Sequence, residues 1–307
     1  MAADPQAPVV VLAGGTGGAK LARGMLDLVG SRLTVIANTG DDVDIYGARV
    51  CPDPDLITFH LADRIDPRGW GLLDDTFEAM AQLEELGAEC WFRLGDRDLA
   101  IGLERSRRLT AGERLTDTLA SLTLAFGVEA TVLPMTDSKV STFITARGRR
   151  RPFQEFMIVD RAEGPVEGVE FEGIQAAEPP PEALAAIGAA EAIVIGPSNP
   201  AISIEPILSV PGLSEAIAAS PAPVVAVSPL VDGNAVKGPT EEFLRAAGIE
   251  VGPEGIAAHY SDVADVLVAD SEAKSLPTHV CDVLMDGLAG QVRLASEVLE
   301  AAASVGR

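Results

Sequence analysis

Short apolar runs alternate with amphipathic stretches over the first forty residues of the chain. The run from Pro8 to Ala13 ends in glycines, as expected for a strand that is buried on both faces of a parallel sheet. Over residues 19–29 the apolar positions recur at helical spacing, and residues 33–37 form a second apolar run. This strand, turn, helix and strand form a βαβ unit. The pattern therefore predicts an α/β fold with a parallel sheet and helices on both faces.

The middle of the chain has a different pattern. From about residue 54 to 128 the periodicity is mainly helical, which we interpret as a helical insertion between two strands. Within it, helices are predicted at 74–86, 98–108 and 113–126. Strand-like runs return at 130–133, 140–146, 191–195 and 223–227, and a final amphipathic helix is predicted at 287–305. Because there is no repeat or long flexible linker, residues 1–307 are predicted to form one α/β domain.

Composition and charge narrow the class of protein. The chain has 46 acidic against 23 basic residues, a net charge of −23, which opposes non-specific nucleic-acid binding. No apolar run reaches the ~20 residues that a membrane span needs, and the N-terminus lacks the pattern of a signal peptide. Three widely spaced cysteines do not suggest a disulfide framework. We therefore expect a cytoplasmic protein that acts on small molecules, and not on nucleic acid or a membrane.

A glycine-rich turn, Gly14-Gly-Thr-Gly-Gly-Ala-Lys20, joins the first predicted strand to the first predicted helix. Glycines let phosphate oxygens approach the N–H groups at a helix N-terminus. The alternative is a tight turn that binds nothing, but four glycines in five positions exceed that need. The turn therefore predicts a phosphate-binding site made by Gly14, Gly15, Thr16, Gly17, Gly18 and Lys20.

This turn matches neither of the common nucleotide-binding motifs. Lys20 occupies the place of the third glycine in the dinucleotide fingerprint, and no Gly-Lys-Ser/Thr follows as in a P-loop. Where an NAD site needs an acid for the ribose, about 20 residues further on, the chain has Asn38. An NAD-dependent oxidoreductase is therefore disfavoured.

Two later loops follow predicted strands and should reach the same edge of the sheet. Ser198 and Asn199, in Ile195-Gly-Pro-Ser-Asn-Pro200, can donate to a phosphate or a base, or can cap the next helix. Lys237 lies in the loop from Ser228 to Pro239; it suits a phosphate, and it is equally well explained as a solvated loop charge.

Acidic residues gather after the second predicted strand. Asp41 and Asp42, followed by Asp53 and Asp55, supply the carboxylates that Mg²⁺ prefers beside substrate phosphates. One of them can instead orient or deprotonate an attacking hydroxyl. The alternative is that they are turn residues of an acidic protein.

The segment Trp91 to Asp98 is dense in charge. Arg93 and Arg97 can hold a phosphate or stack on an aromatic substrate, and Asp96 can cap a helix. The three histidines are isolated, and neither His-x-x-x-His nor Cys-x-x-Cys occurs, so a zinc site is not expected. Catalysis by this chain would then depend on positioning of the substrates, a metal ion and charge, which is typical of phosphoryl transfer.

Together, seven segments resemble the 2-phospho-L-lactate transferase family of coenzyme F-420 biosynthesis. They run in family order over nearly the whole chain: Gly14-Gly-Thr-Gly-Gly-Ala-Lys-Leu21, Asn38-Thr-Gly-Asp-Asp42, Cys51-Pro-Asp-Pro-Asp55, Leu94-Gly-Asp-Arg-Asp-Leu-Ala100, Leu133-Pro-Met-Thr-Asp137, Ile195-Gly-Pro-Ser-Asn-Pro200 and Val236-Lys-Gly-Pro239. The resemblance implies a Rossmann-like core and a homodimer. It also implies Mg²⁺-dependent transfer of a phosphorylated three-carbon acid from a guanosine diphosphate donor to the ribityl hydroxyl of the deazaflavin Fo, with release of GMP.

The resemblance also implies roles for individual residues. Metal ligands are expected among Asp41, Asp42 and Asp53, and catalytic groups at Asp42 and Asp55. Contacts to Fo are expected from Asp55, Arg93, Asp96 and Arg97, and contacts to the nucleotide from the glycine turn together with Ser198, Asn199 and Lys237.

The chain departs from the family pattern on the expected acceptor side. Pro54 and Ile57 replace a Leu and a Thr, and Tyr46 stands where many members have His or Ser. The donor is left open among phospholactate, phosphoenolpyruvate and phosphoglycerate. A related, non-enzymatic regulator that binds a nucleotide sugar is the main alternative.

Overall fold

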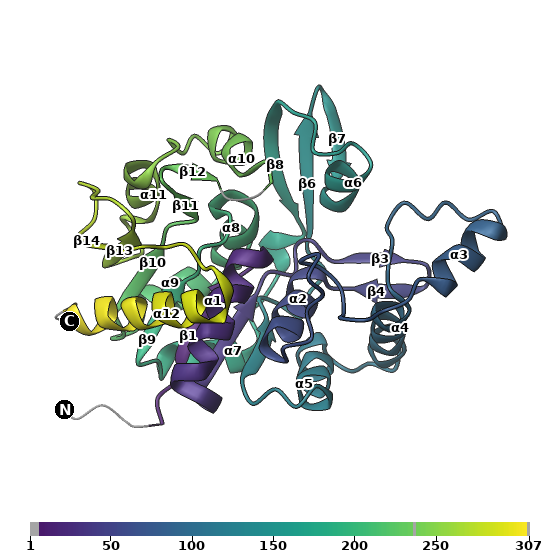
Figure 1. Cartoon of the computed structure of the whole chain (residues 1–307), viewed down its shortest axis with the longest axis horizontal. Helices are drawn as coiled ribbons and strands as arrows, with labels where there is room; N and C mark the ends of the chain where they lie inside the picture. Colours follow the sequence, from purple (N-terminus) through teal and green to yellow (C-terminus); the bar gives the residue numbers. More distant parts are fainter. Residues whose placement is uncertain (1–5, 236–237, 306–307) are drawn as a thin grey trace.

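The computed structural model of the chain describes residues 6–235 and 238–305 (Figure 1). Its centre is a seven-stranded sheet in which all pairs of neighbouring strands are parallel. The order across the sheet is β14-β13-β10-β9-β1-β2-β5. Numbered along the chain, these strands lie in the order 7-6-5-4-1-2-3, which is the doubly wound order of Rossmann folds with one additional strand. The predicted α/β fold with a Rossmann-like parallel sheet is confirmed.

The strands are short and the helices cover both faces of the sheet. The seven strands are β1 (Val9–Ala13), β2 (Leu33–Ala37), β5 (Thr131–Pro134), β9 (Ala192–Ile195), β10 (Val224–Val227), β13 (Val266–Ala269) and β14 (Thr278–Val280). The helices are α1 (Gly15–Val29), α2 (Pro52–Leu61), α3 (Glu78–Glu85), α4 (Asp96–Thr110), α5 (Leu115–Ala125), α6 (Phe153–Ile158), α7 (Pro181–Gly188), α8 (Glu205–Leu208), α9 (Leu213–Ala219), α10 (Thr240–Ala246), α11 (Pro253–Tyr260) and α12 (Gly287–Ser304).

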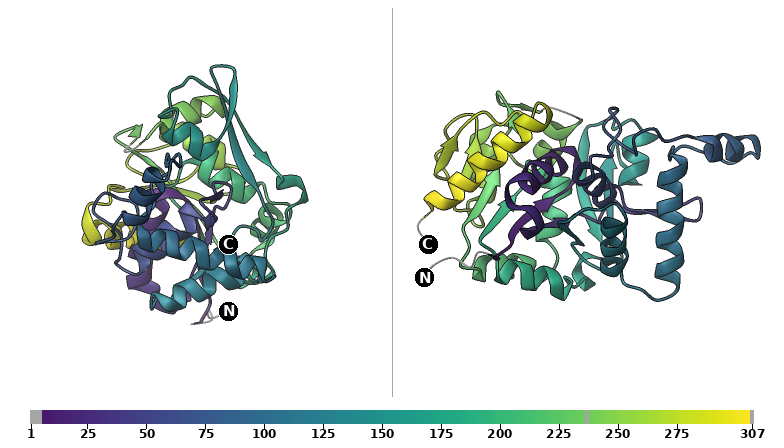
Figure 2. Two further views of the ribbon diagram at one scale, coloured as in Figure 1. Left: turned by 90° about the vertical axis from the view of Figure 1, so that its right-hand side faces the viewer. Right: turned by 60° about the horizontal axis from the view of Figure 1, so that its bottom comes forward.

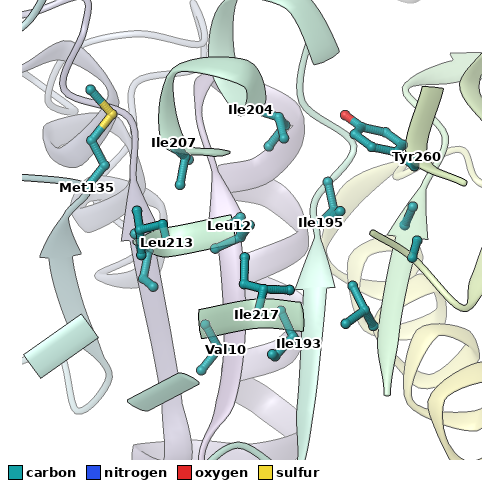
Figure 3. Close-up of a cluster of buried hydrophobic side chains, with 14 of the residues drawn as sticks. Val10, Leu12, Met135, Ile193, Ile195, Ile204, Ile207, Leu213, Ile217 and Tyr260 are labelled. Atoms are coloured by element: carbon teal, nitrogen blue, oxygen red, sulfur yellow. The ribbon is translucent and has the colours of Figure 1, made fainter. Parts of the chain in front are cut away.

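Alternate residues of each buried strand point to opposite faces, so the sheet divides the core in two. Val10 and Leu12 of β1 pack on the side of α7, α9 and α11, as Figure 3 shows for Ile217 and Tyr260. Val9 and Val11 pack on the other side, beneath α1, α2 and α12. Helices α1 and α12 lie side by side (Figure 2), and Gly24 permits this because a Cβ there would lie 2.2 Å from the carbonyl oxygen of Gln291.

The region between β2 and β5 is mainly helical, with α2 to α5 and one hairpin, β3 (Val43–Ile45) with β4 (Ala48–Val50). The predicted helices at 74–86, 98–108 and 113–126 correspond to α3, α4 and α5. Tyr46 and Gly47 form the hairpin turn and both have positive φ, 53° and 79°. The departure from the family pattern at Tyr46 therefore lies at a turn, where its hydroxyl accepts the N–H of Phe92 at 3.2 Å.

The strand predicted at 140–146 exists but does not belong to the central sheet. It is β6 (Ser141–Ala146), the middle strand of an antiparallel sheet with β7 (Arg149–Pro152) and β8 (Val166–Glu172). Its alternating burial differs from the continuous burial of β1. An alternating strand exposes one face to solvent, as antiparallel sheets permit.

Within the described parts of the chain, no single helix is long and apolar enough to cross a membrane; one bent pair, Pro200–Leu208 with Leu213–Ala219, reaches the required length and composition.

Candidate functional site

The glycine turn and the loop after β9 meet where the strand order of the sheet reverses. Strands β1 and β9 are neighbours, and their carboxyl ends lead into residues 14–18 and 196–200. The backbone N–H of Gly14 donates to Ser198 Oγ at 3.1 Å, which joins the two loops directly. Such a switch point is where open α/β sheets bind ligands.

Each glycine of the turn is required either by its backbone conformation or by neighbouring protein atoms. Gly15 has a φ of 62°, which favours glycine, and a Cβ on Gly17 would lie 2.1 Å from the carbonyl oxygen of Pro197. A Cβ on Gly14 or Gly18 would also collide with side chains, at 2.7 Å and 2.6 Å. Packing thus explains Gly14, Gly17 and Gly18, and backbone conformation explains Gly15. This corrects the inference that their number exceeds what a turn without a ligand would need.

A cavity of about 370 Å³ opens at this edge of the sheet. Of the residues singled out from the sequence, it is lined by Gly14, Gly15, Thr16, Gly17, Lys20, Asp41, Asp53, Ser198 and Asn199. The third predicted loop also reaches it, through Ser228 and Pro239 among others. Lys237 lies outside the described residues. Three loops that are far apart in the sequence therefore share one cavity, as their positions after parallel strands predict.

Two carboxylates stand on one wall of the cavity. Asp53, in the first turn of α2, accepts the N–H of Gly15 at 2.7 Å through Oδ1 and the amide of Asn38 at 2.9 Å through Oδ2. Asn38 directly follows β2, and its other amide atom, Oδ1, accepts the N–H of Gly40 at 2.8 Å. This bonding fixes Asp53 against the start of α1. Asn38, which is in the place where an NAD site needs an acid, serves here to orient a carboxylate.

Asp41 is the second carboxylate, and its environment is unusual for a charged group. It is buried, and its Oδ1 atom makes no hydrogen bond within the described structure. Burial, and then the nearby charge of Asp53, raise the pKa of Asp41 well above its usual range. Burial likewise raises the pKa of Asp53. Two carboxylates held close together in a buried wall repel each other unless a proton or a cation lies between them.

These residues fit a magnesium ion. Mg²⁺ is bound by one or two carboxylates together with waters and substrate phosphates. Asp41 and Asp53 provide that set beside the start of α1, and no lysine or arginine in the described ranges forms an ion pair with either. The unpartnered Asp41 Oδ1 supplies a free acceptor atom for a cation.

Asp42 and Asp55 face a different environment, among arginines of the helical insertion. Asp42 Oδ2 accepts the thiol of Cys51 at 2.9 Å and lies 3.6 Å from Arg49 Nε. Burial raises the pKa of Asp42 to about 7, against the opposing charge of Arg49. Asp55 forms a two-point ion pair with the buried Arg105, with 3.1 Å between Nη1 and Oδ2. Neither carboxylate lines the cavity.

The remaining candidates for Fo contacts also lie away from the cavity. The Arg93 side chain is about half exposed and lies 3.6 Å from Glu84. Asp96 accepts the N–H groups of Glu78 and Ala79 at 3.1 and 2.9 Å, and thus caps α3. The backbone N–H of Arg97 donates to Asp75. The structure therefore does not bring these residues together with the glycine turn.

Asn199 and Ser198 serve the protein's own backbone. Asn199 Oδ1 accepts the N–H of Ala201 at 2.9 Å and caps the π-helical turn Pro200–Ile204. Ser198 accepts the N–H of Gly14, and both residues line the cavity. Asn199 thus caps the next helical turn, as one of its two interpretations predicts, and it also lines the cavity.

The cavity also has an apolar wall that was not predicted from the sequence. It is contributed by α6, the π-helical turn, α10 and the segment before α12, with Phe153, Met157, Ile202, Phe243, Val283, Leu284 and Met285. These residues come from elements that approach the sheet edge only after folding. Gln154 of α6 also donates to the carbonyl oxygen of Asp41 at 3.3 Å. No local motif marks such residues.

Comparisons with known proteins agree with this architecture. A family model described as 2-phospho-L-lactate transferase CofD matches residues 9–298. The chain is 39% identical to a phosphoenolpyruvate transferase from Kitasatospora aureofaciens, covering 97% of this chain and 98% of that protein. It is also 39% identical to a 2-phospho-L-lactate transferase from Methanosarcina mazei, covering 87% and 88%. A solved member of the UPF0052 family from Bacillus halodurans has a TM-score of 0.63 at 19% identity, over 95% of this chain and 98% of that one, and is similar in fold.

Proposed function

Because the chain belongs to the 2-phospho-L-lactate transferase family, we propose that it moves a phosphorylated three-carbon acid from a guanosine diphosphate donor to the ribityl hydroxyl of Fo, in coenzyme F-420 biosynthesis. The acid is phospholactate or phosphoenolpyruvate, and GMP is released. The observation that carries this function is the Asp41 and Asp53 pair on the wall of the cavity at the glycine turn. It provides a site for the cation that a diphosphate needs.

The donor nucleotide is assigned to the cavity. The first turn of an α-helix presents N–H groups that lack intrahelical partners, and a helix N-terminus attracts phosphate. Asp53 already accepts the N–H of Gly15, so Thr16 and Gly17 are the next N–H groups along the turn. Lys20 adds a positive charge on the cavity wall, and the apolar wall around Phe153 and Phe243 suits a base or ribose.

Asp41 and Asp53 would hold Mg²⁺, which when bound neutralises charge on the diphosphate. Asn38 keeps the Asp53 carboxylate turned toward the cavity through its amide N–H. The same contact and the N–H of Gly15 leave Asp53 with few free lone pairs, whereas Oδ1 of Asp41 is free in the described structure. Asp41 is thus the stronger of the two candidate ligands.

The acceptor side is assigned to the acidic cluster of the helical insertion. The Fo hydroxyl oxygen bonds to the phosphorus that bears the three-carbon acid, and the bond from that phosphorus to the oxygen retained by GMP breaks. Asp42 is the proposed proton acceptor, because its Oδ1 has no hydrogen-bond partner among the described residues and a pKa of about 7 suits a general base. Asp55, held by Arg105, is proposed to position the acceptor.

The test combines purified protein, Fo and Mg²⁺ with a guanosine diphosphate donor that carries phospholactate, phosphoenolpyruvate or phosphoglycerate. The mass of the product is measured by mass spectrometry. Formation of a phosphodiester of Fo together with GMP is the expected result. Absence of product with all three donors would overturn the assignment. A fluorescence titration with Fo separates the non-enzymatic alternative, since a regulator that binds a nucleotide sugar has no reason to bind the deazaflavin.

We further propose that the chain acts as a homodimer in the cytoplasm. Light scattering of the purified protein would give twice the monomer mass if it is a dimer. A monomeric mass at working concentration would contradict this part of the proposal.

A further inference from the structure

Three side chains of different chemistry meet on the edge of the sheet, outside the cavity. They are His279 of β14, Cys281 just after it, and Glu297 of α12. One ligand atom from each lies within 4.8 Å of the others, and His279 Nε2 lies 2.6 Å from Glu297 Oε2. All three are half-buried, and Cys281 is a free thiol. This cluster takes no part in the function proposed above.

The strand geometry explains why these residues converge. β14 pairs with β13, and the N–H of Cys281 continues the ladder by donating to Ala269 at 2.9 Å. Residues two apart on a strand share a face, so His279 and Cys281 point the same way while Val280 between them is exposed. The zinc motifs His-x-x-x-His and Cys-x-x-Cys have helical or loop spacing, whereas His279 and Cys281 have the His-x-Cys spacing of a strand.

We propose that His279, Cys281 and Glu297 bind a zinc ion, with solvent as the fourth ligand. Zinc takes imidazole nitrogen, thiolate sulfur and carboxylate oxygen together, at ~2.0 to 2.3 Å in a tetrahedral arrangement. Three such atoms within 4.8 Å need only small side-chain movements to surround one ion. The mixed nitrogen and sulfur set favours zinc over the magnesium expected at Asp41, which prefers oxygen ligands alone.

Charge at the site also favours a cation. Glu297, Asp282 and Asp270 all act on Cys281, and Arg293 opposes them. Burial, and then the charge of Glu297, raise the pKa of the Cys281 thiol to about 11, so it is protonated near neutral pH without a metal. Zinc binding therefore replaces the thiol proton, which passes to solvent, and the ion takes the place of the hydrogen bond between His279 and Glu297.

The site is connected to the cavity by a short segment. Residues 283–285, which line the cavity, are separated from Cys281 by Asp282 alone and precede α12. Arg293 of α12 already holds this segment by donating to the carbonyl oxygen of Leu284 at 2.7 Å and pairing with Asp282 at 2.9 Å. A zinc ion joining Cys281 to Glu297 would fix the same segment at its other end. The proposed ion is thus structural and stabilises one wall of the cavity.

The experiment uses the full-length protein after treatment with a chelator. Zinc is titrated against a competing chromophoric chelator, and cobalt(II) is titrated separately and followed by absorption. We expect one equivalent of zinc bound and, with cobalt, a thiolate-to-metal charge-transfer band. Cys281→Ser should abolish the band, and His279→Gln should weaken zinc binding by roughly 10-fold or more.

Two control variants test whether the charge-transfer band arises from Cys281. Cys90→Ser, at another half-buried free cysteine, and Asp41→Asn, at the cavity, should both retain it. Absence of the band in the unmodified protein, or its persistence in folded Cys281→Ser as judged by circular dichroism, would overturn the zinc site. Because the band reports only on the thiolate, this outcome is independent of whether the protein transfers anything to Fo.

Discussion

Two pairs of aspartates with largely buried side chains lie within fifteen residues of each other in the sequence, yet their surroundings are opposite. Asp41 and Asp53 face the cavity without an arginine or lysine partner in the described structure, whereas Asp42 and Asp55 face Arg49 and Arg105. Neighbouring residues thus serve different sites, because the chain turns between them. The comparison shows that a cluster of carboxylates is informative only when its counter-charges are known: the pair with arginines is already compensated, whereas the pair without arginines carries charge that a proton or a cation would offset.

The largest loss of stability is expected when the arginine that compensates the charge of Asp55 is removed. Arg105→Met would leave Asp55 buried beside an uncharged side chain, and breaking a buried ion pair costs about 3–5 kcal/mol. Urea unfolding would measure the loss. Arg107→Met on the same helix is the control, because Arg107 is exposed and, among the described residues, pairs only with Glu104; it should change stability by less than about 0.5 kcal/mol. Equal effects of the two variants would mean that Arg105 does not compensate Asp55.

The metal assignment predicts the next largest effect. Asp41→Asn and Asp53→Asn should each lower Mg²⁺-dependent turnover roughly 100-fold, since even residues that only support metal ligands are worth about 10–100-fold. The concentration of Mg²⁺ that gives half-maximal rate should also rise in both variants.

The variant Asp42→Asn distinguishes the role of a proton acceptor from the role of a metal ligand. It should lower the turnover number as a proton acceptor would, without a change in the half-maximal Mg²⁺ concentration. If Asp42→Asn shifted the Mg²⁺ dependence and Asp41→Asn did not, the two pairs would have exchanged roles.

The pH dependence of stability separates the pairs in another way. In the unfolded chain Asp42 titrates near ~4, and in the folded protein burial raises its pKa to about 7. Between these values the folded state keeps a proton that the unfolded state has lost, so this group makes the protein less stable as pH rises from 4 to 7. Asp42→Asn lacks this titration. Its stability relative to the unmodified protein should therefore increase over that window and stay constant above it; a difference independent of pH would contradict the raised pKa.

The sequence predicted the fold better than the site. The continuous apolar runs of β1 and β2 and the helical spacing of α1 are local signals, and they correctly indicated a parallel sheet. The strand at 141–146 was predicted, but its sheet was not, because pairing with the arginine-rich β7 and the glutamate-rich β8 depends on contacts distant in sequence.

The positions of the loops at the sheet edge were also predictable, since parallel strands end at one edge. The residues that contact one another across the fold could not be predicted from the sequence. Nothing local to Asp55 indicates that Arg105 lies against it, and nothing local to Phe153 indicates a cavity wall. Both contacts form only when the insertion and the antiparallel sheet pack on the core. Residue type and spacing therefore predicted the candidate site residues, whereas the counter-charges of the aspartates became known only from the tertiary structure.

The smallest effect is expected at Asp96, where a role in capping and a role in binding Fo can be told apart. As the cap of α3, Asp96 accepts two backbone N–H groups, and Asp96→Ala should lower stability by about 1 kcal/mol. Asp96→Asn keeps a capping oxygen, so it should recover most of that stability in thermal or urea unfolding. If the charge of Asp96 instead contacts Fo, Asp96→Asn would bind Fo as weakly as Asp96→Ala in the fluorescence titration. Because both carboxylate oxygens of Asp96 already accept N–H groups at the start of α3, we expect Asp96→Asn to bind Fo like the unmodified protein.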